Sequence, residues 1–130
     1  MKIYKSVIIQ KQLSASELKC LVSDFRRYKK LNQIPDSFGR DALYDHPNTL
    51  PSVLQEEIAH IHLVDPKNWH VRTVQFNKTS DTHLVYCPGY IERDTYLLMA
   101  ILAPDAHSQA RKRSIMWKLA EIAQGFRERH

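Results

Sequence analysis

The sequence contains few of the residues that keep a chain from packing. Its 130 residues include three glycines and six prolines, and no stretch is of low complexity. Disordered regions and flexible linkers are rich in such residues and poor in apolar ones, whereas 43% of this chain is hydrophobic. A chain of this length buries one core. We therefore expect a single ordered domain over residues 1–130.

Long apolar runs and a signal peptide are also lacking. No run approaches the length of about 18 residues that a membrane-spanning helix needs, and residues 1–4 lead directly into a strand-like pattern. The two cysteines, Cys20 and Cys87, fall in a predicted helix and a predicted strand, far apart in the sequence. We interpret them as buried thiols rather than as a disulfide or a metal pair. These absences favour a cytoplasmic protein without a membrane partner.

Acidic residues are outnumbered by basic ones. The chain has 14 acidic and 19 basic residues, which give it a net charge of +5 at pH 7. Such a charge favours a polyanionic partner such as RNA, because it attracts phosphates over the whole surface. Solubility alone would also account for an excess of this size, so the charge does not decide the function.

Two short apolar runs, at residues 83–87 and 96–102, form the central feature of the chain. Both are rich in Val, Ile, Leu and Tyr, and Pro88 and Gly89 begin the polar segment between them. This pattern is typical of two strands in an antiparallel hairpin. The second run has no alternating polar residue, so we expect it to be buried on both faces in the middle of a sheet. Further strands are predicted at residues 3–9, 59–64 and 71–78.

Helices are predicted on both sides of these strands in the sequence. Ser14 and Glu17 have the spacing of a capping box, and apolar residues follow at helical intervals until about Leu31. A second amphipathic helix is expected at residues 106–127. Between them, proline and glycine interrupt the chain, and only short helices are expected, around residues 38–44 and 52–57.

This order of elements predicts an α+β fold. We expect an antiparallel β-sheet with an N-terminal helical segment and a C-terminal helix packed on one of its faces. The opposite face need not be covered, and it would then display polar side chains.

Several short stretches resemble one protein family. They are FGRDALYD at 38–45, AHIHL at 59–63, HLVYC at 83–87, LLMAIL at 97–102 and the pattern of His107, Ala110 and Arg111. In this order, over nearly the whole chain, they resemble the YafO family of toxins, which is similar in turn to the RelE-like toxins. The resemblance implies a single RelE-like toxin domain at residues 1–130 that cleaves messenger RNA in the ribosomal A site without a cofactor. The partners it implies are the ribosome, messenger RNA and a cognate, YafN-like antitoxin.

Metal-independent RNA cleavage requires a small set of groups. The ribose 2′-OH attacks the adjacent phosphorus, one group takes its proton, another protonates the leaving 5′ oxygen, and cations stabilise the charge on the phosphate. Histidine suits the proton transfers near neutral pH, and arginine binds phosphate oxygens in a bidentate manner.

His83, His107 and Arg111 are the candidate catalytic residues. His83 begins one strand of the predicted hairpin, and that end lies beside the end of the partner strand, after which His107 and Arg111 follow. His107 and Arg111 stand four residues apart, so on a helix both reach the same phosphate. The alternatives are a buried histidine bonded to a backbone carbonyl for His83, and a helix N-terminal residue without function for His107.

Further basic residues are candidate RNA contacts. His60 and His62 share one face of a predicted strand, with Ile61 pointing the other way. We predict no metal site there, because tetrahedral centres take three or four ligands and no Cys or Glu stands at a matching spacing. A structural or RNA-binding role is expected for them instead. Candidate phosphate contacts are Arg40, Arg72 and Lys78. An internal ion pair between Arg40 and Asp41 is the alternative for that pair.

Two classes of function remain open from the sequence. The first is a ribosome-dependent endoribonuclease toxin that inhibits translation. The second is a non-catalytic basic module that binds RNA or a protein. Histidines and arginines near strand ends favour the first, since a scaffold of apolar strands does not need them.

Overall fold

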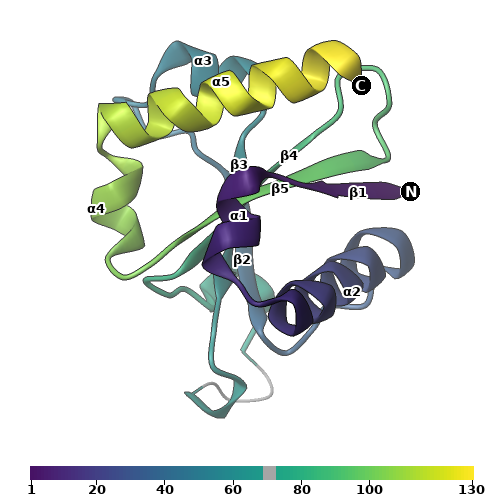
Figure 1. Cartoon of the computed structure of the whole chain (residues 1–130). Coiled ribbons are helices and arrows are strands. Elements are labelled where there is room, and N and C mark those ends of the chain that lie inside the picture. The colour runs from purple at the N-terminus through teal and green to yellow at the C-terminus, as the bar shows by residue number, and fades with distance from the viewer. Residues whose placement is uncertain (69–72) are drawn as a thin grey trace.

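A five-stranded sheet forms the centre of the computed structural model, which describes residues 1–68 and 73–130 (Figure 1). The strands lie in the order β1-β5-β4-β3-β2. Their bounds are β1 Lys2–Lys5, β2 Phe38–Leu43, β3 Ala59–Leu63, β4 His83–Pro88 and β5 Thr95–Leu102. The predicted hairpin of β4 and β5 is confirmed, and β4 is the middle strand. The sheet is mixed rather than wholly antiparallel, because β1 runs parallel to β5.

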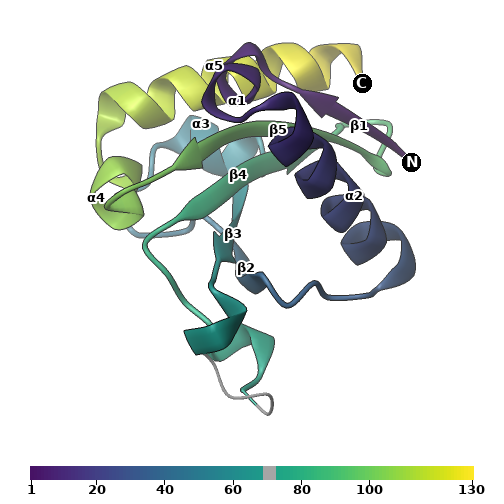
Figure 2. The same ribbon diagram turned by 60° about the horizontal axis from the view of Figure 1, so that its bottom comes forward.

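Helices cover both faces of this sheet (Figure 2). The helix α2 (Ala15–Leu31) packs on one face, and α3 (Pro51–Gln55), α4 (Ala106–Ala110) and α5 (Arg113–Arg129) pack on the other. The expectation that helices cover only one face is therefore wrong. The physical reason lies in the strands: β4 and β5 are apolar on both sides, and each side has to be removed from water.

The core accordingly has two halves. Leu98 is fully buried with Phe25 of α2 on one face, and Val85 is fully buried with Leu119 of α5 on the other. Ile101, expected in the core, is only partly buried. Cys87 is buried as predicted, whereas Cys20 is exposed on α2, so the expectation for Cys20 is wrong.

The N-terminal strand is shorter than predicted. It ends at Lys5, and Ser6 begins a short helix, α1 (Val7–Gln12), because its side-chain oxygen accepts a hydrogen bond from the backbone N–H of Ile9 at 3.2 Å. Gln12 then bonds to both backbone groups of Ile101, the nitrogen at 2.7 Å and the carbonyl at 2.9 Å. In this way α1 continues along the edge of β5 beyond β1.

The helix α2 forms as predicted. Ser14 and Glu17 make the two reciprocal hydrogen bonds of a capping box, and Asn32 ends the helix in the left-handed conformation with a φ of 54°.

Two of the predicted helices differ in the structure. Residues 38–43 form the edge strand β2, because they pair with β3, and Gly39 permits a close approach: a Cβ there would lie 2.1 Å from the carbonyl oxygen of Lys78. The helix expected at 106–127 is divided into α4 and α5 at Arg111 and Lys112. The short helix α3 lies close to its predicted place.

The segment between β3 and β4 also differs from the expected strand at 71–78. Residues 66–68 and 75–77 form short 3₁₀ helices, Pro66–Asn68 and Gln75–Asn77. Positions 71 and 72 of the predicted strand, including the candidate Arg72, lie outside the described residues. Within the described part of the chain, no helix combines the length and the apolar character needed to cross a bilayer.

Candidate active site

A cleft of about 570 Å³ lies between α4 and the segment that follows β2. Its floor is formed by side chains of β3 and β4, and its rim by the start of α5 and the residues after β2. One acidic residue, Asp45, lines it. The basic side chains that line it are Arg40, His46, His60, His83, His107, Arg111 and Arg113.

His83 lies at the floor of this cleft, at the first position of β4. Its side chain is 1% exposed, and strand pairing places it opposite His62 of β3. Its Nδ1 lies 2.9 Å from the hydroxyl oxygen of Tyr44, so its partner is a side chain and not the backbone carbonyl expected as the alternative. Burial, reinforced by the neighbouring histidines, lowers the pKa of His83 to about 3. This imidazole is therefore neutral at pH 7.

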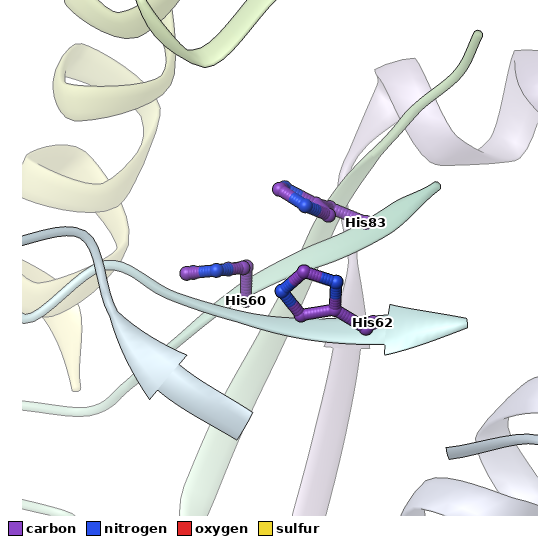
Figure 3. A group of neighbouring side chains, drawn as sticks. All are labelled: His60, His62 and His83. Carbon is purple, nitrogen blue, oxygen red and sulfur yellow. The ribbon is translucent and has the colours of Figure 1, made fainter. Parts of the chain in front are cut away.

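Two further imidazoles, of His60 and His62, stand beside it on β3 (Figure 3). The ring centroid of His83 lies 4.5 Å from that of His60 and 4.4 Å from that of His62. Both are buried, and Ile61 between them points into the opposite half of the core, as the alternation predicted. Burial lowers the pKa of His60 to about 4 and also lowers the pKa of His62.

Residues outside the strands hold this cluster in place by ring stacking and hydrogen bonding. The ring of Tyr44 stacks on His60 with centroids 4.0 Å apart and planes 13° apart. Nδ1 of His62 lies 3.0 Å from the carbonyl oxygen of Ser80. Nδ1 of His60 and Nε2 of His83 are buried and lack a hydrogen-bond partner among the residues that the structure describes.

His107 stands above His83 on the exposed side of the cluster. Their ring centroids lie 5.1 Å apart, with the planes at 89°. The position of His107 follows from Asp81, two residues before β4. The carboxylate of Asp81 accepts a hydrogen bond from the backbone N–H of Asp105 at 2.8 Å. The backbone carbonyl of Asp81 accepts one from the backbone N–H of Ala106 at 3.1 Å. These bonds fix the start of α4 beside the start of β4.

The arginines occupy the rim. Arg111 is exposed at the C-terminal end of α4, and Arg113 begins α5. Arg40 reaches the cleft from β2, where its Nε donates to the carbonyl of Phe76 at 2.7 Å and its guanidinium lies 4.1 Å from the Phe76 ring. The structure thus brings His83, His107 and Arg111 to one cleft, whereas their catalytic roles stay a prediction.

Other candidates lie elsewhere. Lys78 is half-buried beside β2 and does not line the cleft. Asp41 faces the α2 side, where it pairs with Lys29 at 3.4 Å and accepts hydrogen bonds from Tyr28 and Tyr86. The alternative of an ion pair between Asp41 and Arg40 is therefore wrong, because the two side chains leave β2 on opposite faces.

Comparison with known proteins agrees with the resemblance in the sequence. Residues 26–128 match the model of a family described as toxin YafO of a type II toxin-antitoxin system. The chain belongs to the YafO toxin family. It is 44% identical over 131 residues to the mRNA interferase toxin YafO of Escherichia coli (strain K12), covering 99% of both chains. No solved structure matches the chain. Membership of a type II toxin-antitoxin family implies an antitoxin as a partner of this toxin.

Sequence reasoning did not select Tyr44, His46 and Arg113, whose polar side chains also line the cleft of this YafO-family toxin. One signal was present for Tyr44. If residues 38–44 had been predicted as a strand, positions 40, 42 and 44 would share a face, and Ala42 of that face pairs with His60. No such signal points to Arg113, because the break between α4 and α5 places it at the rim.

Proposed function

We propose that this toxin cleaves messenger RNA by attack of the ribose 2′-OH on the adjacent phosphorus and thereby inhibits translation. The products are a 2′,3′-cyclic phosphate and a 5′-hydroxyl. The observation that carries the proposal is the cleft in which imidazoles and guanidinium groups from β2, β3, β4, α4 and α5 meet. The name of the Escherichia coli relative, an mRNA interferase toxin, supports the same activity.

We assign proton transfer to His107. Its ring is exposed beside the cleft, so a bound ribose or leaving oxygen can reach it without displacing the core. His83 lies beneath it and lines the cleft, and its Nε2 has no hydrogen-bond partner among the described residues. Its role is therefore to donate a hydrogen bond from Nε2 to a phosphate oxygen when the proton is on that nitrogen. None of these steps uses a metal ion.

Arg111 stabilises the charge that develops on the phosphate. Its guanidinium stands at the rim beside His107 and carries its charge at any physiological pH. Arg40 and Arg113 flank the same opening and would bind the neighbouring phosphates of the RNA strand. His60 and His62 support the floor. Lys78, outside the cleft, is proposed as a more distant contact with RNA, and Arg72, which lies outside the described residues, is proposed as a phosphate contact.

We further propose that cleavage takes place on the ribosome, in the cytoplasm. The net charge of +5 supports docking on ribosomal RNA, since each neutralised phosphate releases counterions. A cognate, YafN-like antitoxin would inhibit the toxin by covering the cleft or by blocking its entry into the ribosome.

The test is a cleavage assay with purified toxin and messenger RNA, in the presence and absence of programmed ribosomes. The wild-type toxin is expected to cut ribosome-bound RNA to cyclic-phosphate products. His107→Ala and Arg111→Ala are expected to cleave about 10²–10⁴-fold more slowly, because each removes a group that acts in the transition state. Both residues are exposed, so the variants should unfold at the wild-type temperature.

The matched control is Lys118→Ala, which removes an exposed cation from α5 outside the cleft. It should cleave at the wild-type rate. Cleavage at wild-type rates by both cleft variants would assign the reaction to other residues, with His60, His62 and Arg40 to be tested next. Intact RNA after incubation of wild-type toxin with programmed ribosomes would favour the non-catalytic binding module.

A further inference from the structure

The imidazoles of His60, His62 and His83 form a compact buried group that the proposed reaction uses only in part (Figure 3). We call these three residues the histidine cluster. One ring nitrogen of each can be chosen so that all three atoms lie within 4.8 Å of one another. Such a group is unusual in a core, because a buried polar atom without a partner costs free energy, and two nitrogens of this cluster lack one among the described residues.

We propose that His60, His62 and His83 together bind one Zn²⁺ ion. Zinc takes imidazole nitrogens at about 2.0–2.1 Å, which places tetrahedral ligand atoms about 3.3 Å from one another. The three ligand atoms, which lie within 4.8 Å of one another, would move closer together when the ion binds. The two unpartnered nitrogens, Nδ1 of His60 and Nε2 of His83, would gain the ion as their partner.

The groups around the cluster support this assignment. In one tautomer, Nδ1–H of His83 donates to the Tyr44 hydroxyl and Nδ1–H of His62 donates to the Ser80 carbonyl, which leaves Nε2 of both rings free to bind metal. Metal-binding histidines commonly donate their other N–H in this way. In the other tautomer of His62, Nδ1 accepts from the Ser80 N–H at 2.8 Å. Zinc binding requires the first tautomer, in which Nε2 of His62 carries no proton.

The chemistry of the cluster points to zinc rather than to calcium or magnesium. All three ligands are neutral nitrogens, whereas calcium and magnesium require oxygen. A tetrahedral ion held by these three ligands would have its fourth position open on the side of His107, whose ring centroid lies 5.1 Å from that of His83 and 5.9 Å from that of His62. This is the arrangement of a zinc ion held by three protein ligands with one open position.

The three ligands are too far apart in the sequence for the site to be recognised as a metal-binding motif. His60 and His62 alone offer two ligands, which is why the sequence predicts no metal centre. The third comes from β4, 21 residues after His62, through the pairing of His62 with His83.

Zinc binding at the histidine cluster would affect RNA cleavage, and this inference rests on the proposed function. Zinc would occupy Nε2 of His83, the atom that the proposed reaction offers to the phosphate. Bound zinc is therefore expected to inhibit RNA cleavage, and removal of zinc by a chelator should restore it.

The test uses full-length toxin, freed of metal by chelation and of any affinity tag, and titrated with Zn²⁺ in a calorimeter. One ion per chain is expected. His62→Gln and His83→Gln each remove one ligand and should weaken binding by about 100-fold or more, while Tyr44→Phe, which removes only a supporting hydrogen bond, should weaken it about tenfold. The matched control is His46→Gln, an exposed cleft histidine outside the cluster, which should bind zinc like the wild type.

A second measurement does not depend on the variants folding. Histidine ring ¹⁵N shifts of the wild-type protein should change on zinc addition at His60, His62 and His83, and Co²⁺ in place of Zn²⁺ should show the intense visible bands of a tetrahedral site. Absence of stoichiometric binding by the wild type, or equal binding by the cluster variants and the control, would overturn the site. If zinc binds at the cluster but cleavage continues unchanged, the site stands and the inhibition is wrong. If the wild type cleaves only when zinc is bound, the metal-free mechanism and the inhibition are both wrong. If it cleaves neither with nor without zinc, the proposed function fails, whatever the titration shows.

Discussion

At the residue scale, the hydroxyl of Tyr44 is the side-chain partner of Nδ1 of buried His83, and its ring covers His60. Tyr44→Phe keeps the stacked ring and removes only the hydrogen bond. We expect the free energy of unfolding to fall by about 1–3 kcal/mol, because a buried imidazole nitrogen is left without its hydrogen-bond partner. Urea denaturation measures this change.

The control for that experiment is Tyr4→Phe, which removes a hydroxyl from a residue that is 37% exposed on β1. Its stability should equal that of the wild type. A Tyr44→Phe variant as stable as this control would show that water replaces the hydroxyl beside His83.

The ion pairs of Glu57 predict a second measurable effect, a dependence of the free energy of unfolding on pH. Glu57 accepts hydrogen bonds from Arg93 and from Arg127, each at 2.8 Å, and Arg127 is 5% exposed and also pairs with Glu56 at 3.3 Å. The Arg93 hydrogen bonds lead in lowering the pKa of Glu57 from 4.5 to about 2. Because the folded state holds the carboxylate ionised, this contribution to stability is complete above about pH 4.5 and is lost as the pH falls toward 2.

Glu57→Gln is therefore expected to lower the free energy of unfolding at pH 7 by about 1 kcal/mol. The value is smaller than for a fully buried pair, because the Glu57 side chain is 37% exposed and solvent screens it. The difference between variant and wild type should shrink between pH 4.5 and pH 2 in urea denaturation. Asp36→Asn, at an exposed carboxylate, is the control. A difference that is constant with pH would contradict the assignment.

At the scale of elements, the position of α4 decides where His107 stands. This helix has only five residues, and its start is held by hydrogen bonds to Asp81. Isolated helices of this length are unstable in water, so long-range bonds of this kind keep α4 in place. Asp81 is in this sense a positioning residue for His107.

We expect Asp81→Ala to slow RNA cleavage by about 10–100-fold, because a displacement of about 1 Å at a reacting group has an effect of that size. Asp81→Asn keeps an oxygen that accepts the hydrogen bond from Asp105, and it should restore most of the rate. Hydrogen exchange at the Ala106 and Gln109 amides supplies a readout apart from activity. It should accelerate in Asp81→Ala and not in Asp81→Asn. Unchanged exchange in both variants would refute the role of Asp81.

At the scale of the whole molecule, the basic surface predicts how an antitoxin arrives. The net charge is +5, and the exposed cations Arg111 and Arg113 stand at the rim of the cleft. We expect an acidic antitoxin segment to bind there, with an association rate that falls roughly tenfold between low and high salt, because salt screens electrostatic steering. Stopped-flow measurements at several salt concentrations test this. The dissociation rate should change less, and equal association rates across that range would argue against electrostatic docking.

The sequence by itself determined the elements whose signals are local. The capping box of Ser14 and Glu17 and the helical spacing after it were enough to predict α2. The short apolar runs with Pro88 and Gly89 between them were enough to predict the β4–β5 hairpin at the middle of the sheet. Helix capping and side-chain periodicity depend on residues that are close together in the sequence, so they can be recognised without knowledge of the fold.

Tertiary structure alone decided the elements and contacts that depend on distant partners. Residues 38–43 have a proline- and glycine-interrupted sequence around them, and they become a strand because β3 offers its edge. The C-terminal helix divides at Arg111 and Lys112, and a hydrogen bond to distant Asp81 holds the start of α4. The histidine cluster arises from the register of β3 against β4, which sets His62 opposite His83. Strand register and long-range hydrogen bonds join positions more than 20 residues apart, and no periodicity within either segment encodes them.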